Sequence, residues 1–235
     1  MKGKLFLIPT TLGDTEIDQV IPNQILQLIP DIKHFIVENI RTTRRYLKKV
    51  NQDINIDDLT FYELNKRTSP KDISTYLDAI TDNDMGIISE AGCPGVADPG
   101  ADVVKIAHTK NIEVVPLVGP SSLLLSLMAS GFNGQNFAFN GYLPIPSDER
   151  SKKIKHLDHR SLSEGQTQMF IETPFRNMKM LEDLLQNCSP ATKLCIAADI
   201  TLESEYIKTM SIQAWKNNLP ELHKRPAIFL IHRDK

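Results

Sequence analysis

Short runs of almost continuously apolar residues recur through the first half of the chain, and they limit its fold more than any other feature. The runs cover residues 4–8, 34–38, 85–89 and 112–117, and segments with helical patterns separate them. Strands of a parallel sheet read this way because helices cover both faces of the sheet. The first half therefore predicts an α/β domain with a mostly parallel sheet.

One helix in this half carries a full set of start signals. Ser69 supplies a hydroxyl for the cap, Pro70 occupies the first helical position, and Asp72 places an anion in the first turn. A fixed φ at the first position and a negative charge near the N-terminus both favour a helix. We therefore expect a helix to begin directly after Ser69.

The character of the chain changes after Gly119. Residues 121–130 carry apolar side chains on all sides of a helix, which predicts a buried helix at a junction between domains or between subunits. We place the domain boundary near residue 118, with an N-terminal α/β domain at 1–118 and a C-terminal α/β domain at 119–235.

The second half predicts a further α/β domain. Its candidate strands are residues 137–140, 168–172, 194–199 and 227–232. A helix is expected after Thr173, with Pro174 at its first position and a core-facing stripe of Phe175, Met178, Leu181 and Leu185.

Composition and missing motifs exclude several classes of protein. The net charge is −2 with 24% charged residues, so no global positive field draws the chain to phosphate backbones. The three cysteines form no CxxC pair, which argues against a disulfide framework and a thiolate metal site and favours a cytoplasmic location. No run is long enough to span a membrane. The absence of GxxxxGK[ST], GxGxxG and HExxH patterns weighs against ATP, NAD and a metal.

Three loops rich in glycine and proline follow strands, where open α/β sheets bind their ligands. They are Pro-Thr-Thr-Leu-Gly at 9–13, Ser-Glu-Ala-Gly-Cys-Pro-Gly-Val-Ala-Asp-Pro-Gly at 89–100, and Gly-Pro-Ser-Ser at 119–122. The first and third could each be an ordinary turn. The middle loop has more glycine and proline than a short connection needs, and it predicts a ligand site around Glu90 and Asp98.

Together these loops resemble the tetrapyrrole methylase superfamily. Within it, the chain is most similar to the branch that methylates a ribose 2′-hydroxyl of small-subunit ribosomal RNA, and Ile-Glu-Thr-Pro-Phe-Arg at 171–176 is similar to that branch's Tyr-Glu-Ser-Pro-His-Arg. The resemblance runs from residue 5 to about residue 230.

The resemblance implies two α/β domains, the first with a mostly parallel sheet and the second with a mixed sheet. It also implies S-adenosylmethionine bound in the cleft between the domains, and a homodimer. It also implies a set of cofactor-binding positions on the three loops and on later strand ends. These are Pro9, Gly13, Glu90, Gly92, Pro94, Gly95, Val96, Ser121, Ser122, Leu143, Glu172 and Ala198.

A ribose acceptor needs a group that orients its hydroxyl or takes the proton, because an alcohol is a weak nucleophile at neutral pH. Glu38, Arg41 and Asp199 are the catalytic candidates. Glu38 and Arg41 match the outer positions of the family's Cys-Glu-Asp-Thr-Arg segment, with Asn39 and Ile40 between them. Asp199 lies in Ala-Asp-Ile-Thr-Leu at 198–202, where the family has Arg-Glu-Leu-Thr-Lys.

A local basic face offers a place for RNA. Arg41, Arg44, Arg45 and Lys48 recur at helical spacing and are the substrate-binding candidates, with Lys49 beside them. A solvated helix face gives the same pattern.

Three functions remain open from the sequence. The first is a methyltransferase acting on the ribose 2′-oxygen of ribosomal RNA, with RNA or a ribosomal subunit as its partner. The second is a methyltransferase for a small or tetrapyrrole-like acceptor. The third is a catalytically silent relative that binds the cofactor or a protein partner, which the altered segments at Asn39 and Asp199 suggest.

Overall fold

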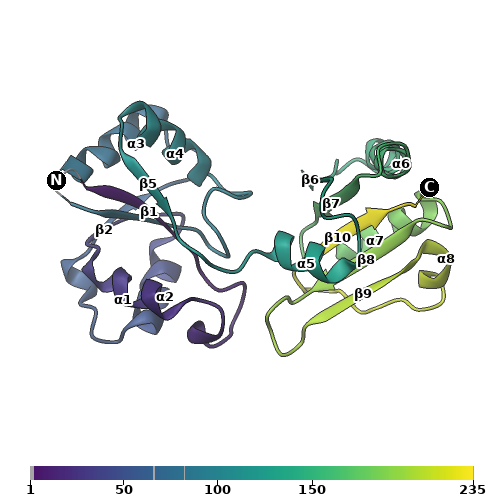
Figure 1. The fold of residues 1–235 in the computed structure, drawn as a ribbon, viewed down its shortest axis with the longest axis horizontal. Coiled ribbons are helices and arrows are strands. Elements are labelled where there is room, and N and C mark those ends of the chain that lie inside the picture. Colours follow the sequence, from purple (N-terminus) through teal and green to yellow (C-terminus); the bar gives the residue numbers. More distant parts are fainter. Residues whose placement is uncertain (1–2, 66, 82, 235) are drawn as a thin grey trace. The chain divides into compact units, whose positions relative to one another are not determined.

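The chain forms two compact units, each built on a five-stranded sheet (Figure 1). The computed structural model describes residues 3–65, 67–81 and 83–234. The first unit ends at Ser121 and the second begins at Ser122, close to the boundary near residue 118 that the sequence suggests. Among the described residues, no helix combines the length and apolar character that a membrane span requires.

The sheet of the first unit is entirely parallel. Its strands are β1 (Lys4–Ile8), β2 (His34–Val37), β3 (Thr60–Glu63), β4 (Met85–Ile88) and β5 (Glu113–Pro116), in the order β3-β2-β4-β1-β5. The four strands expected from the apolar runs are present. The sequence analysis missed β3, because Thr-Phe-Tyr-Glu is short and polar at both ends and lies at the edge of the sheet.

Helices cover both faces of this sheet and create two cores. Residues of α1 (Asn23–Leu28) and α2 (Ile40–Val50) pack with Phe6, Ile8 and Phe35 on one face. Residues of α3 (Pro70–Tyr76) and α4 (Gly100–Thr109) pack with Leu5 and Ile87 on the other. Helix α3 begins as expected: the Ser69 hydroxyl accepts from the Asp72 backbone N–H, and the Asp72 carboxylate accepts from the Ser69 backbone N–H.

The strand order creates a switch point between β1 and β4. The connection after β1 runs through α1 on one face, whereas the connection after β4 runs through α4 on the other. Neighbouring strands whose connections leave on opposite faces open a crevice at their carboxyl ends, which is where such sheets bind ligands. Two of the three glycine-rich loops begin at this point.

The second unit has a mixed sheet, as expected. Its strands are β6 (Phe137–Tyr142), β7 (Thr167–Ile171), β8 (Lys193–Ala198), β9 (Tyr206–Ser211) and β10 (Ala227–His232), in the order β6-β7-β10-β8-β9. Strands β6 and β7 are parallel, and β10 is antiparallel to both β7 and β8. The carboxyl ends of β6, β7 and β8 therefore lie at one edge. The sequence analysis missed β9, which is partly exposed.

Helices α6 (Ser147–Ser163), α7 (Asn177–Asn187) and α8 (Ile212–Trp215) complete this unit with α5 (Ser122–Ser130). The predicted start of α7 at Pro174 is wrong. The Glu172 carboxylate accepts from the Thr173 backbone N–H at 2.6 Å and from Arg176, and this arrangement holds residues 174–176 in a turn. The expected place of Phe175 in the core stripe is also wrong, because its side chain is 69% exposed.

Helix α5 differs from the fully buried helix that its composition suggests. Its buried residues are Ser126, Leu127 and Ser130, whereas Leu124 and Met128 are 54% and 77% exposed. The two serine hydroxyls donate to carbonyls three residues earlier in the chain, at Leu123 and Leu127, so they enter the interior with their hydrogen bonds made. The two serines and Leu127 thus face inward, whereas Leu124 and Met128 face outward.

Candidate functional site

The three glycine-rich loops meet at the carboxyl ends of β1, β4 and β5. The backbone N–H of Thr10 in the first loop donates to the carbonyl of Gly92 in the second at 2.9 Å. The Cys93 thiol donates toward the carbonyls of Gly119 and Pro120 in the third, at 3.7 and 3.4 Å. Burial raises the pKa of the Cys93 thiol, so this group stays protonated and serves as a donor. Segments more than 80 residues apart in the sequence therefore form one surface.

Glycine is required at two contacts between these loops. A Cβ on Gly119 would lie 2.1 Å from the Cβ of Pro9, and a Cβ on Gly92 would lie 3.1 and 3.2 Å from Leu12 and the Pro120 carbonyl. Gly92 also has φ +73°, in the left-handed region that side chains disfavour. The glycines thus bring the backbones of the three loops close together.

Tyr46 fixes the first loop to α2. Its hydroxyl donates to the Pro9 carbonyl at 2.7 Å, and its side chain is buried. Burial raises the pKa of this phenol well above its usual value, so the proton that makes the bond is retained. The sequence pattern gave no signal for this role, because a tyrosine in an amphipathic helix reads as ordinary packing.

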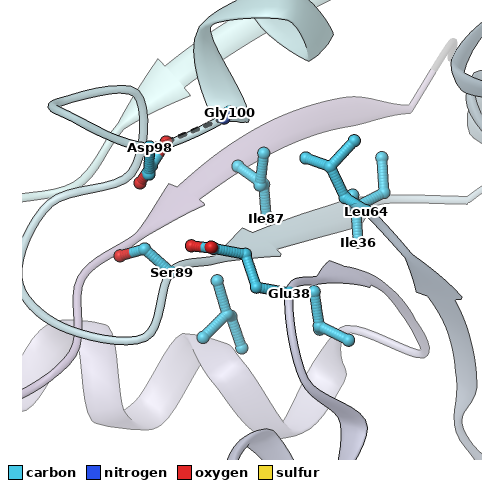
Figure 2. Close-up of a pocket in the computed structure, with 9 residues that line it drawn as sticks. Ile36, Glu38, Leu64, Ile87, Ser89, Asp98 and Gly100 are labelled. Atoms are coloured by element: carbon cyan, nitrogen blue, oxygen red, sulfur yellow. Dashed lines mark hydrogen bonds between the residues drawn. The ribbon is translucent and has the colours of Figure 1, made fainter. Parts of the chain in front are cut away.

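The middle loop is closed by Asp98. Its Oδ1 accepts backbone N–H groups from Gly95 at 2.8 Å and from Gly100, the first residue of α4, at 2.7 Å (Figure 2). Glu38 lies close to the same loop, because it lines one small cavity together with Ser89 and Asp98. Figure 2 shows the Glu38 side chain extending toward Ser89. Sequence reasoning predicted a ligand site around Asp98 and missed that this side chain closes the loop.

Glu90 projects from the middle loop toward α2. Its Oε1 accepts the Thr42 hydroxyl at 2.6 Å. Glu90, Thr42 and Thr10 line a cavity of about 480 Å³ that opens beside the loops. Its volume is in the range of small-molecule sites. One wall of this cavity is the basic helix α2.

All four substrate-binding candidates lie on the exposed side of α2. Arg44, Arg45 and Lys48 line a second, more open hollow of about 830 Å³, and Arg45 also lines the first cavity, so the two adjoin. The Arg44 guanidinium lies over the Phe61 ring, 5.4 Å from its centroid. Arg41 is exposed in the first turn of the helix. Lys49 also lines both hollows and pairs with Asp14 at 2.6 Å.

The expected site residues of the second unit gather at the carboxyl edge of its sheet. Leu143 follows β6, Glu172 follows β7, and Ala198 ends β8. All three are buried, and the Glu172 carboxylate is paired with Arg176. Ser121 ends the first unit and Ser122 begins α5.

Asp199 is held in a strained turn at the same edge. Its φ is +51°, and its Oδ2 accepts from Ser204 at 2.9 Å and from Arg225 at 2.7 Å. Arg225 also donates to the Ser204 carbonyl, which ties the turn together. This carboxylate is committed to its own loop.

No group of three or more His, Cys, Asp or Glu side chains within the described ranges is placed to hold a metal ion.

Comparison with characterised proteins identifies relatives over nearly the whole chain, although no family model matches it. The chain is 27% identical over 233 residues to the ribosomal RNA small subunit methyltransferase I of Buchnera aphidicola subsp. Schizaphis graminum, which covers 97% of this chain and 78% of that protein. It is 26% identical to the protein of the same name from Vibrio cholerae and 28% identical to that from Streptococcus pyogenes serotype M6; each match covers 97% of this chain and 76% of the relative.

Solved structures of methyltransferases share the fold of this chain. The methyltransferase CobJ superposes with a TM-score of 0.64 at 15% identity, covering 98% of this chain and 94% of that one. Uroporphyrin-III C-methyltransferase from Thermus thermophilus, complexed with S-adenyl homocysteine, gives 0.58 at 14% identity, covering 98% and 97%. The chain has the tetrapyrrole methylase fold, and the resemblance read from its three loops is confirmed, with similarity to the ribosomal RNA methyltransferase I proteins.

The contact between the first and third loops makes a direct prediction. We expect Gly119→Ala to lower the free energy of unfolding by about 1–3 kcal/mol, because its methyl group would overlap Pro9 and force the loops apart. Denaturant unfolding measures this change. Gly134→Ala is the matched control, since a Cβ there meets no atom within 4 Å. Equal free energies of unfolding for the two variants would contradict the prediction that close packing of Gly119 on Pro9 stabilises the protein.

Proposed function

We propose that this chain is an S-adenosylmethionine-dependent methyltransferase that methylates a ribose 2′-hydroxyl of ribosomal RNA. The observation that carries the proposal is the meeting of three glycine-rich loops at the switch point of the first sheet, directly beside a basic helix. Relatives named ribosomal RNA small subunit methyltransferase I over 97% of the chain support the same assignment.

The residues of the loops fit this cofactor. Close packing at Gly92 and Gly119 leaves backbone carbonyls and N–H groups at the surface, and carbonyl oxygens suit the polarised C–H groups next to a sulfonium. Glu90 supplies a carboxylate for an ammonium group. In this proposal Pro9, Gly13, Gly92, Pro94, Gly95, Val96, Ser121 and Ser122 form the backbone surface, while Leu143, Glu172 and Ala198 wall the adenosyl part. The cofactor would supply an electrophilic methyl group.

The basic face of α2 and its two adjoining hollows are the proposed RNA surface. Exposed Arg41, Arg44, Arg45 and Lys48 offer cations for phosphates along a path that leads into the cavity lined by Glu90. The chain's net charge of −2 makes this local concentration stand out.

The protein's part in catalysis would be alignment and proton removal. Holding the acceptor oxygen in line with the methyl group removes much of the entropic barrier. Of the three catalytic candidates, Glu38 lies beneath the middle loop and Arg41 opens the basic face, so both suit the acceptor side. Asp199, paired with Arg225, would shape the wall of the second unit.

Cofactor binding is the first test. We expect calorimetry to give a Kd for S-adenosylmethionine on the order of 1–100 µM. Glu90→Lys should weaken binding at least about tenfold, since it replaces a charged acceptor with a cation. Glu182→Lys, an exposed charge reversal on α7, is the matched control and should bind like the wild type. Absence of binding by the wild-type protein, with and without RNA, would defeat the proposal.

RNA binding provides the second test. We expect Arg41→Glu combined with Arg44→Glu to weaken ribosomal RNA binding and to reduce its logarithmic salt dependence by about 0.7 for each lost phosphate contact. Cofactor affinity should persist. The control is Lys71→Glu with Lys105→Glu, which reverses two exposed charges on α3 and α4, over the other face of the sheet. Equal RNA affinity of the two double variants would contradict the proposed surface.

We further propose a homodimer in the cytoplasm. The outward Leu124 and Met128 of α5 support association of two copies, because a closed two-fold contact buries the same apolar patch on both subunits. Two observations support the cytoplasm. Relatives are named ribosomal RNA small subunit methyltransferase I, and the three cysteines are free.

Light scattering tests the dimer. We expect wild-type protein at micromolar concentration to have twice the mass of one chain, and Met128→Asp to have the mass of one chain. Leu219→Asp, at another exposed apolar residue, should remain dimeric. A single-chain mass for the wild type would contradict the dimer.

A further inference from the structure

The two oxygens of the Asp98 carboxylate have different surroundings. Oδ1 accepts from Gly95 and Gly100 and so holds the middle loop against the start of α4. Oδ2 is buried and has no hydrogen-bond partner among the described residues. Both hydrogen bonds that hold the loop are made by Oδ1 alone. The second oxygen is costly to bury without a partner, and its position calls for a separate explanation.

Asp98 and Glu38 line one small cavity, together with Ser89. The cavity measures about 10 Å³, close to the room that one water molecule needs. Ile36, Ile87 and Leu64 form its apolar wall. In Figure 2 one Asp98 oxygen is bonded to Gly100, and the Glu38 side chain reaches toward Ser89 on the same side of the loop.

The surroundings of Glu38 disfavour its ionised form. Burial raises the pKa of the Glu38 carboxyl, and the negative charges of Asp98 and Glu90 raise it further. The N–H of Glu90 acts in the opposite direction. Burial also raises the pKa of Asp98, against the two N–H groups of Gly95 and Gly100. Glu38 is thus a stronger base than a free glutamate, at a position directly under the proposed cofactor loop.

We propose that Asp98 is a positioning residue for methyl transfer: one oxygen fixes the middle loop to α4, and the other faces Glu38 across the cavity and makes Glu38 the base that takes the acceptor's proton. This inference rests on the proposed methyltransferase function. The acceptor oxygen gains the methyl group, the sulfur keeps the electron pair of the broken carbon–sulfur bond, and the hydroxyl proton passes to the Glu38 carboxylate.

The closing experiment separates the two roles of Asp98: holding the loop through hydrogen bonds, and acting on Glu38 through its negative charge. Asp98→Asn keeps an amide oxygen that accepts from Gly95 and Gly100 but removes the negative charge. The pKa of Glu38 is followed by carbon NMR of the side-chain carboxyls, with its signal assigned as the one that Glu38→Gln removes. We expect Asp98→Asn to lower the pKa of Glu38 by about one unit, because removal of a like charge favours ionisation. Asp102→Asn, an exposed carboxylate in the first turn of α4, should leave it unchanged.

The pH dependence of turnover gives the second measurement. Because Glu38 must be ionised to accept a proton, kcat rises with pH through its pKa, and Asp98→Asn should move that rise about one unit toward lower pH. Glu38→Gln should lower kcat about 10²–10⁴-fold with a smaller change in the KM for S-adenosylmethionine. A purely structural Asp98 would alter stability and cofactor binding and leave the position of the rise in place.

An unchanged pKa of Glu38 in Asp98→Asn would overturn the proposal, as would full turnover by Glu38→Gln. If Asp98→Asn does not fold, Asp98→Ser takes its place, because serine also removes the negative charge. The pKa of Glu38 should fall in this variant as well, and an unchanged value would overturn the pairing. The NMR titrations need neither cofactor nor RNA. Failure of the methyltransferase assignment would therefore appear as absent turnover in the wild type, separately from the titration result.

Discussion

The first unit depends on close backbone packing between loops that lie far apart in the sequence. Gly119 meets Pro9, Gly92 meets Pro120, and the Thr10 N–H reaches the Gly92 carbonyl. Parallel strands make this possible because β4, β1 and β5 are adjacent and end at the same edge. Side chains at these glycines would separate the loops, whereas their absence lets peptide groups form the surface. A site made of backbone dipoles suits a cofactor whose own charge is positive and diffuse, because it needs orientation more than a strong counter-ion.

Positive and negative groups lie in different places around this surface. Cations are concentrated on α2, whereas the carboxylates of Glu90 and Asp98 belong to the middle loop and that of Glu38 lies close to it. Glu90 is bonded to Thr42 of α2. This separation matters because a cation next to the cofactor would oppose its charge, and phosphate next to the carboxylates would be repelled. Tyr46 links the two regions: its helix carries the basic face, and its hydroxyl holds the first loop. The basic helix and the first loop are therefore joined by one buried hydrogen bond.

Sequence reasoning recovered the features that local physics determines. Continuous apolar runs predict the buried strands, and the capping box of Ser69 and Asp72 predicts the start of a helix. The errors arose where tertiary contacts override local pattern. Strands β3 and β9 are partly polar and lie at sheet edges. Pro174 looked like a first helical residue, yet the bonds of Glu172 to Thr173 and Arg176 delay the helix to Asn177. The loops of the site could be found from composition, but not the contacts of Tyr46 and Asp98, which join residues with no shared pattern.

The departures of this chain from its relatives' motifs have local structural explanations that leave the proposed chemistry intact. Asn39 is the N-cap of α2, where its side-chain oxygen accepts from the Arg41 and Thr42 N–H groups, and asparagine and aspartate cap equally well. Ile40 packs at the edge of the first core. In the second unit, the turn after Ala198 lacks the family's own cations, but Arg225 reaches Asp199 from elsewhere in the chain and neutralises it. The substitutions thus preserve the helix start beside Glu38 and the turn beside the second sheet. What they change is the charge presented outward, and the proposed RNA surface therefore depends on the cations of α2.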